Sequence, residues 1–456
     1  MRRSRHLQRS RVARRGGGRR GADAHRHRRD GDRRSHARDR RRSVPPQRPA
    51  EPGSDQRSTI PLVGLHRSAC SRLRGGRAVR VTIVHAYSTT NSGDGLLVEE
   101  ARELVLSALP TAEITLVALD PASFDEELYE SVLHPLTGRA GSIGSLETLR
   151  RGGVALLSGR RSAGYARAIA GSDLVVGVGG GYLRTKNPVE VVKMMCTNFV
   201  QMPRRSDRVP FVYLPQSIGP LNLGTRRVIA ARLARAVGVF ARDDRSVEEL
   251  SGLANVHRAP DMALLGLPDE FDPRTVVRAG APGPVGIVAR ALSSSRSRRA
   301  AYESRIDALA RDPESELLAQ ATARGNNDPQ FYERLGHEGP FRLLRDAVGS
   351  GVADRPAVVV SVRLHGSIQT IRSGVPSVHL SYERKGWGAY DDLGIDRFVH
   401  NAFDADLSLI RDQIAELRED PSDYWRRVGD SVSALRMQRG RLVDLLVDAS
   451  GPVGRP

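Results

Sequence analysis

The sequence predicts an α/β protein made of two Rossmann-like halves, each built on a parallel sheet, with an interdomain cleft between them. Three observations support this fold class. Short apolar runs such as 81–87 and 173–179 alternate with longer helix-like runs. The apolar runs are nearly continuous, which is typical of strands that are buried on both faces of a parallel sheet. A stretch rich in Pro, Gly and Asp at 264–284 separates two such series, as expected of an interdomain linker.

The first series forms the expected N-terminal half, residues 79–265, which is followed by a linker at 266–283. We expect its strands at 81–87, 113–119, 173–179, 210–220 and 237–243. We expect its helices at 96–109, 157–171, 225–236 and from Ser246. Strands that alternate with helices in this way form a parallel sheet with helical crossovers.

The second series forms the expected C-terminal half, residues 284–447, which ends in a short tail at 448–456. We expect strands at 284–290, within 355–367 and at 375–382, and helices at 299–311, 368–373 and over 403–447. Two similar halves joined by one linker indicate a GT-B-like architecture. Such folds bind ligands at the carboxyl ends of their strands, in the cleft that faces the partner half.

The basic charge of the chain lies in its first 80 residues. The formal net charge is +19, and residues 1–80 hold 25 Arg and 6 acidic residues, which account for all of it. Beyond them, 46 basic and 46 acidic residues balance, so we expect no specific nucleic-acid surface there. Residues 1–78 lack apolar periodicity and are predicted to form a disordered, Arg-rich tail.

Three alternatives stay open for this tail. It could be an arm that binds RNA, DNA or anionic lipid, or it could be a transit peptide. The third alternative is a misassigned start, with translation beginning near Val79. Of the 71 basic residues, 68 are Arg, which indicates GC-rich coding DNA. The lysines are Lys186, Lys193 and Lys385.

The composition also excludes several classes of protein. The two cysteines, Cys70 and Cys196, rule out a disulfide framework and a Cys-based zinc site. No run is long and apolar enough for a membrane span, and the apolar run at 60–65 is too short for a signal peptide. We therefore expect a cytoplasmic protein.

The first candidate motif is N-S-G-D-G, which lies between the first strand and a helix. Free backbone N–H groups at a helix N-terminus can bind a phosphate or a carboxylate. Asn91, Gly93 and Asp94 are therefore candidates to bind substrate. Asp94 could instead cap the helix.

The second motif is the glycine run that follows the strand at 173–179. Gly179, Gly180 and Gly181 permit a close approach of the backbone to a ligand. A tight turn between a strand and a helix would need the same glycines. Their spacing does not match the dinucleotide-binding motif, which disfavours a nicotinamide-dependent dehydrogenase.

Two further motifs follow predicted strands. In Q-S-I-G-P, Gln216 and Ser217 stand where a strand ends and could face the cleft, although the segment could also be a turn shaped by Pro and Gly. In R-D-D-R-S, Arg242 could hold a phosphate or carboxylate with its guanidinium fork. A surface salt bridge is the alternative for Arg242, and Asp243 and Ser246 are expected to order the turn.

The fifth motif, S-V-R-L-H-G-S, follows a strong apolar run. Arg363 and His365 are two residues apart, so on a strand both side chains would point to the same side. A buried Arg in an apolar run is costly unless it meets an anion. We therefore expect Arg363 and His365 to be functional.

Taken in order, these motifs resemble the polysaccharide pyruvyl transferase family. The similarity runs over residues 81–396 and includes A-P-D at 259–261 and G-V-P-S-V-H-L-S-Y-E-R-K at 374–385. Residues 293–345 match poorly apart from N-N-D-P-Q-F-Y. The Arg-rich tail has no counterpart in the family.

The resemblance implies a GT-B-like fold and phosphoenolpyruvate as the donor, with no cofactor and no metal. Family members transfer the pyruvyl group to hydroxyls of a cell-surface glycan or its lipid-linked precursor, form a ketal and release phosphate. Arg242, Arg363 and His365 match the positions for donor binding and catalysis, and Lys385 is a further candidate to bind substrate. A lipid-linked acceptor would place the enzyme at the inner membrane surface.

These residue types suit the implied reaction. Phosphoenolpyruvate carries a phosphate and a carboxylate, so its site needs at least two cationic or N–H-rich anchors. His365 is the candidate general acid that protonates the methylene carbon, because an imidazolium has an ordinary pKa of about 6.5. Asp94 or Glu383 could act as the base. No carboxylate cluster has the spacing of a metal site.

Three alternatives are weighed against this interpretation. A GT-B glycosyltransferase that uses a nucleotide sugar would share the fold, the glycine loops and an Arg for the diphosphate. An anionic-polymer binder would act through the Arg-rich tail, and its binding would depend steeply on salt. An inactive family member is the third, which the retention of Arg363 and His365 disfavours.

Overall fold

The computed structural model describes residues 78–222, 224–272, 276–278, 280–323, 326–349 and 351–451. The predictions made for residues 1–77 and 452–456 lie outside the described residues. Two parallel sheets with helical crossovers follow one another along the described chain. This confirms the predicted α/β class with two Rossmann-like halves.

The first sheet has the strand order β3-β2-β1-β4-β6-β7-β8, and β5 pairs with β6. All of these pairs are parallel. The strands are β1 (Arg80–Ala86), β2 (Glu113–Ala118), β3 (Ser131–Leu133), β4 (Leu174–Gly177), β5 (Gly180–Thr185), β6 (Phe211–Leu221), β7 (Gly238–Ala241) and β8 (Val256–Arg258). The helices are α1 (Ser92–Ala108), α2 (Ser145–Ser158), α3 (Ala163–Gly171), α4 (Pro188–Thr197), α5 (Thr225–Leu233), α6 (Asp244–Glu249), α7 (Met262–Leu265) and α8 (Leu267–Glu270).

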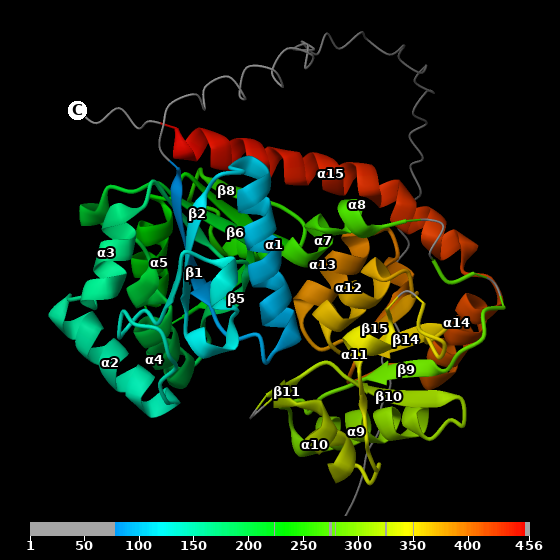
Figure 1. Ribbon diagram of the computed structural model, residues 1–456. Helices are drawn as coiled ribbons and strands as arrows, with labels where there is room; N and C mark the ends of the chain where they lie inside the picture. The colour runs from blue at the N-terminus through cyan, green and yellow to red at the C-terminus, as the bar shows by residue number, and fades with distance from the viewer. Residues whose placement is uncertain are drawn as a thin grey trace, which may run out of the picture. The chain divides into compact units, whose positions relative to one another are not determined.

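Helices cover both faces of this sheet, which explains why its strands are apolar throughout. Neighbouring residues of β1, Ile83 and Val84, are both fully buried but belong to different apolar clusters. Side chains of successive strand residues point to opposite faces, so each face has its own core. Figure 1 shows α1 on one face of the sheet and α3 and α5 on the other.

Two elements of the first half differ from the prediction. The helix expected at 157–171 is two helices, because α2 ends at Ser158 and Gly159 adopts a left-handed conformation with φ of 66°. The glycine run was interpreted as a loop or turn, but Gly180 begins β5, which pairs with β6. Consecutive glycines carry no apolar signal from which a strand could be predicted.

The second sheet has the strand order β13-β10-β9-β14-β15-β16, again with parallel pairs. The strands are β9 (Val285–Val288), β10 (Ser315–Ala319), β13 (Arg342–Leu343), β14 (Val358–Ser361), β15 (Ser377–Ser381) and β16 (Val399–Asn401), and β11 (Thr322–Ala323) and β12 (Asn326–Asn327) form a separate antiparallel pair. The helices are α9 (Arg296–Ala310), α10 (Asp328–Arg334), α11 (Leu344–Ala347), α12 (Leu364–Arg372), α13 (Arg384–Asp392), α14 (Leu407–Glu419) and α15 (Ser422–Ser450).

The strand expected to carry Arg363 and His365 ends before them, at Ser361. Arg363 is the N-cap residue of α12, and His365 is the second residue of this helix. The prediction that both side chains leave a strand on the same side is therefore wrong. Leu364 and Ile368 are both buried at helical spacing, so the end of the apolar run belongs to the buried stripe of a helix.

The last helix, α15, returns to the first half of the chain. It contacts α1, α7 and α8, and Figure 1 shows it as the long red helix beside α1. A second link joins the halves in the interior, where Arg372 of α12 donates to Glu100 of α1 over 2.5 Å. Within the described ranges, every helix is too short or too polar to cross a bilayer.

Candidate active site

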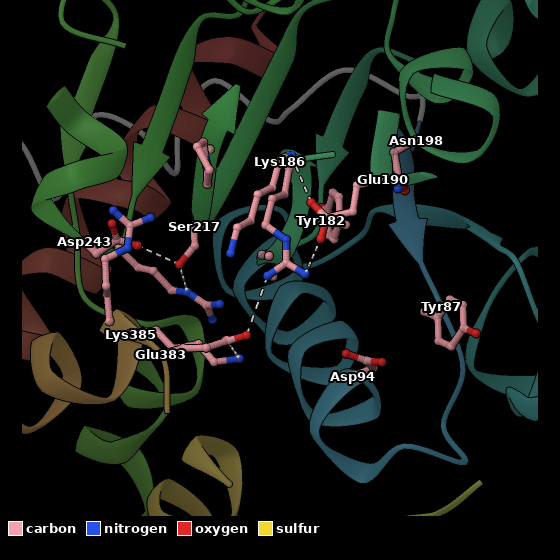
Figure 2. A pocket seen from close by; sticks show the side chains of 18 of the residues that line it. Tyr87, Asp94, Tyr182, Lys186, Glu190, Asn198, Ser217, Asp243, Glu383 and Lys385 are labelled. Carbon is pink, nitrogen blue, oxygen red and sulfur yellow. Dashed lines mark hydrogen bonds and ion pairs between the residues drawn. The ribbon is translucent and has the colours of Figure 1, made fainter. Parts of the chain in front are cut away.

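A cavity of about 1370 Å³ lies at the carboxyl ends of strands from both sheets. The first half contributes residues that follow β1, β4 and β7, such as Tyr87, Gly179 and Arg242. The second half contributes residues that follow β9 and β15, such as Arg290 and Tyr382. Parallel α/β sheets bind their ligands at this edge. The cavity, part of which Figure 2 shows, is therefore the candidate active site.

The cavity gathers four of the predicted motifs around one space. The predicted site residues that line it are Asp94, Gly179, Gly180, Gly181, Ser217, Arg242 and Lys385. The predicted residues that lie outside its lining are Asn91, Gly93, Gln216, Arg363 and His365. Arg242 is buried, as are Arg363 and Gln216, whereas His365 keeps a side-chain exposure of 13%.

Arg242 is fixed by two neighbours. Its Nη1 donates to Oδ2 of Asp261 over 2.5 Å, and its Nε donates to Oγ of Ser217 over 3.0 Å. Ser217 in turn donates to Asp243, which caps α6 through the backbone N–H of Ser246. Because this ion pair is buried, the alternative of a surface salt bridge is wrong. No described group accepts a hydrogen bond from Nη2 of Arg242, so this N–H group is available to a ligand.

Asp261 holds the position between Arg242 and His365. Its Oδ1 caps α7 through the backbone N–H of Ala263 at 3.0 Å and lies 3.8 Å from Nε2 of His365. Burial acts to raise the pKa of Asp261, but the charge of Arg242 and the nearby His365 hold it well below its usual range. Asp261 is therefore an anion, and it was not among the residues predicted to form the site.

His365 lies against the N-S-G-D-G motif, which forms the N-cap and first turn of α1. A Cβ added to Gly93 would lie 2.5 Å from Nδ1 of His365, so this position needs a glycine. In the described chain, Nε2 of His365 is buried without a hydrogen-bond partner. The imidazole thus lies between Gly93 on one side and Asp261 on the other.

Of Gly93, Asp94 and His365, Asp94 is the residue that lines the cavity. Burial raises its pKa, although the nearby His365 and a hydrogen bond from Asn91 oppose the shift. The Asn91 amide donates to Oδ2 of Asp94 over 2.8 Å. The alternative that Asp94 caps α1 does not hold, because the N-cap residue is Asn91. Asp94 is therefore a titratable group at the cavity wall whose pKa is influenced by the nearby His365.

Arg363 forms a buried ion pair with a carboxylate of the chain itself. Its Nε lies 3.0 and 2.9 Å from the two carboxylate oxygens of Asp328, and its Nη2 also contacts this carboxylate. Asp328 accepts further hydrogen bonds from the backbone N–H groups of Gln320 and Ala321, both at 3.0 Å. This ion pair fixes the β14–α12 junction that carries His365. A contact of Arg363 with substrate stays a prediction.

The remaining predicted residues differ in their surroundings. Asn91 bridges to Ala321 of the second half. Gln216 is fully buried, and among the described residues its side-chain amide has no partner. A Cβ on Gly179 would lie 2.4 Å from the carbonyl oxygen of Pro215, so close packing against β6 requires this glycine. Gly181 borders the cavity, where a Cβ would lie 3.4 Å from Nη2 of Arg242.

His85 is a cavity residue that the sequence analysis did not identify. It is buried, has φ of 71° and stacks on the rings of Tyr182 and Tyr213 with centroids at 5.1 and 5.3 Å. Burial lowers its pKa to about 3, so the ring is neutral near pH 7. A positive φ is unusual for a residue with a side chain and is concentrated at functional sites. A single His at the end of a strand gives no such signal in the sequence.

One ion pair of the cavity joins the two halves, and its members also pair with a neighbour in their own half. Arg184 of β5 lies 3.1 Å from Glu190 of α4 and 3.6 Å from Glu383 of the β15–α13 loop. Nζ of Lys385 lies 3.3 Å from the other oxygen of Glu383. Burial acts to raise the pKa of Glu383, but Lys385 and Arg184 hold it below its usual range. Figure 2 shows these interactions as dashed lines in the centre of the cavity.

The cavity is rich in cationic groups, including every lysine of the chain. Its lining contains nine basic and six acidic side chains. Lys186, Lys193 and Lys385 all belong to it, although Lys385 alone was predicted as a site residue. The sequence feature that could have identified Lys186 and Lys193 is the rarity of lysine among the 71 basic residues.

Comparisons with known proteins identify the family of the chain. The family model described as polysaccharide pyruvyl transferase matches residues 91–384. No curated protein matches the chain. A UDP-GlcNAc 2-epimerase from Neisseria meningitidis, solved with UDP-GlcNAc bound, is similar at 10% identity and a TM-score of 0.48, over 81% of this chain and 99% of that chain. A UGT transferase from Siraitia grosvenorii, in complex with UDP, has a TM-score of 0.43 at 10% identity, over 82% of this chain and 99% of that chain.

Proposed function

The chain belongs to the polysaccharide pyruvyl transferase family, and from this premise we propose that it transfers the pyruvyl group of phosphoenolpyruvate to hydroxyls of a cell-surface glycan or its lipid-linked precursor. The observation that carries the proposal is the fixed guanidinium of Arg242, which keeps an unused N–H group at a cavity shared by both halves. We further propose that the reaction takes place in the cytoplasm, at the membrane surface where the acceptor is lipid-linked.

The donor is held by its two anionic groups. Arg242 and Lys385 both line the cavity, from the first and the second half respectively. Arg290 lines it too, and its buried Nε has no hydrogen-bond partner among the described residues. Guanidinium and ammonium groups bind phosphate and carboxylate through charge-assisted hydrogen bonds. These three cations can neutralise the phosphate and the carboxylate of phosphoenolpyruvate.

In the proposed reaction, a proton adds to the methylene carbon C3 and makes C2 an oxocarbenium ion. A sugar hydroxyl attacks C2 and gives up its proton. A second hydroxyl then attacks C2, the C2–O bond to phosphate breaks, and phosphate leaves with the electron pair of that bond. The proton released by the first hydroxyl replaces the one that was added to C3. The proton released by the second hydroxyl is taken up by the departing phosphate, so atoms and charges balance.

Asp94 and His365 supply the proton to C3. Asp94 faces the cavity, and its raised pKa makes it a better proton carrier near neutrality than an ordinary aspartate. His365 lies outside the cavity lining, next to Gly93, and we propose that it protonates the donor through Asp94. The carboxylate of Asp261 lies 3.8 Å from Nε2 of His365 and orients the imidazole.

Glu383 is the proposed base for the attacking hydroxyl. Its pKa is lowered, so it is ionised near pH 7. Its carboxylate lies in the cavity between Arg184 and Lys385. A carboxylate in this position can accept a hydroxyl proton while the neighbouring cations hold the departing phosphate.

Ligand-dependent thermal unfolding of the full chain tests the choice of donor. A ligand that binds the folded state raises the melting temperature with its concentration. Phosphoenolpyruvate should raise it in the parent protein, and UDP-glucose should not. A rise with UDP-glucose and none with phosphoenolpyruvate would transfer the assignment to a nucleotide-sugar glycosyltransferase.

A further inference from the structure

The lysines of this chain are concentrated at one site. There are 3 Lys among 71 basic residues, and all three line the cavity of about 1370 Å³. Elsewhere the sequence uses Arg for basic positions, including the surface pairs of the helices. Lys and Arg are not interchangeable, because an ammonium is a compact point charge on a flexible stem, whereas a guanidinium is a rigid planar fork. The three lysines therefore add compact charges on flexible stems to a cavity that also contains arginines.

Two of the lysines belong to one segment of the first half. Lys186 lies just before α4, and Lys193 lies seven residues further on, inside this helix. Lys186 precedes Asn187, the N-cap residue of α4, and both lysines line the same cavity. Both residues are exposed in the cavity lining. In the described ranges, neither ammonium lies within ion-pair distance of a carboxylate, whereas Lys385 is paired with Glu383.

Lys186 lies on the opposite side of the cavity from Lys385, one of the groups assigned to the donor. Figure 2 shows Lys186 entering from the β5–α4 side, beside Tyr182 and Glu190, and Lys385 entering from the other side with Glu383. The cavity is larger than the range of about 300–1,000 Å³ that is usual for one small ligand. There is room for an acceptor next to the donor.

We propose that Lys186 and Lys193 form the acceptor site and that they recognise a sugar carrying an anionic group, either a phosphate or a carboxylate. This inference rests on the proposed function and adds to it the chemical class of the acceptor. A sugar phosphate, such as the headgroup of a lipid-linked precursor, and a uronic acid share this chemistry. The ammonium groups bind the anion and thereby place a hydroxyl of the same sugar toward the donor.

The test is calorimetric binding to the full chain with its donor site saturated by phosphoenolpyruvate. The probes are glucose 1-phosphate, glucuronate and glucose. We expect at least one anionic probe to bind about tenfold more tightly than glucose, because charge-assisted hydrogen bonds are the stronger ones. Preference for glucose 1-phosphate indicates a phosphate-bearing acceptor, and preference for glucuronate indicates a uronic acid.

The double variant K186Q/K193Q should lose this preference and keep its affinity for phosphoenolpyruvate. The matched control is R167Q/R227Q, which removes two exposed charges outside the cavity and should keep the preference. Equal binding of charged and neutral probes, or no binding of any, overturns the proposal. So does a loss of phosphoenolpyruvate affinity in K186Q/K193Q, which would assign the lysines to the donor. Failure of the parent protein to bind phosphoenolpyruvate at all would instead contradict the proposed function.

Discussion

Nη1 of Arg242 lies 2.5 Å from Oδ2 of Asp261, and both side chains are only 2% exposed. The pair connects the end of β7 to the start of α7, and Asp261 also approaches His365 of the second half. One buried carboxylate thus orients the cation assigned to the donor and the imidazole assigned to proton transfer.

The variant D261N should be strongly destabilised. Removal of one partner from a buried ion pair leaves an uncompensated charge and costs about 3–5 kcal/mol. Urea unfolding of the variant and the parent measures the difference. E147Q is the control, because Glu147 pairs with Arg150 on the surface, and it should leave the unfolding midpoint unchanged. Equal midpoints for D261N and the parent would show that the pair does not stabilise the fold.

The same ion pair should contribute to the acid sensitivity of the protein. The folded pKa of Asp261 is held below its unfolded value of about 3.9. Its contribution to stability is therefore present above that value and is lost as the pH falls toward the folded pKa, starting below about pH 5. The free energy of unfolding, measured between neutral and acidic pH, should fall less steeply with decreasing pH in D261N than in the parent. A parallel pH dependence in both proteins would contradict the depressed pKa.

The variant D328N should affect turnover rather than donor affinity. Asp328 is fully buried and holds Arg363 at the junction that positions His365. Loss of its charge should lower the stability by about 3–5 kcal/mol and should reduce kcat. The Kd of phosphoenolpyruvate, measured by calorimetry below the unfolding range, should be retained. A large rise in Kd would instead support the prediction that Arg363 contacts the donor.

The variant G93A should displace His365. The added Cβ would lie 2.5 Å from Nδ1 of His365, so the ring must move. Misplacement of a catalytic group by about 1 Å can reduce the rate by about a hundredfold, and we expect kcat to fall by that order. G153A is the control, because a Cβ at this helical glycine meets nothing within 4 Å. It should keep full activity; a loss in G153A equal to that in G93A would refute the specific contact.

The rate should depend on the protonation of Asp94. Because burial raises its pKa, the protonated form persists to higher pH than in an ordinary aspartate, and kcat should fall as the pH rises through that pKa. D94N cannot ionise, so its residual rate should lack this dependence. E99Q, an exposed neutral variant in the same helix, should keep the parent profile. An unchanged profile in D94N would remove Asp94 from the proton path.

The apolar pattern was sufficient to predict most of the sheets. Residues 81–86 and 375–381 are buried throughout, and hydrophobic burial along a continuous run is a local signal. The pattern failed in two situations. One is an apolar run that is shared by a strand and the following helix, and the other is a strand that begins without apolar residues. Leu364 extends an apolar strand in sequence but belongs to the stripe of α12. Gly180 and Gly181 begin β5 through pairing with β6, which depends on a distant segment.

The candidate site was predicted in part because its motifs follow strands that end at one edge. Arg242 and Asp94 do line the cavity. The partner of Arg363, however, is Asp328, which lies 35 residues away in the N-N-D-P-Q-F-Y segment, and the sequence does not show which residue this carboxylate pairs with. His85 is distinguished by a backbone conformation, and the role of Lys186 depends on which residues surround it in space. Neither property is visible in the sequence alone.

The most direct test of the central claim is calorimetric titration of phosphoenolpyruvate into the full chain and into R242Q. Arg242 presents an unused N–H group to the cavity, so the parent should bind the donor at a single site. R242Q should bind it at least about tenfold more weakly, since a charge-assisted hydrogen bond is lost. R227Q, with its exposed charge outside the cavity, should bind like the parent. Equal affinity in the parent and R242Q, or no binding to the parent, would contradict the assignment of this cavity to pyruvyl transfer.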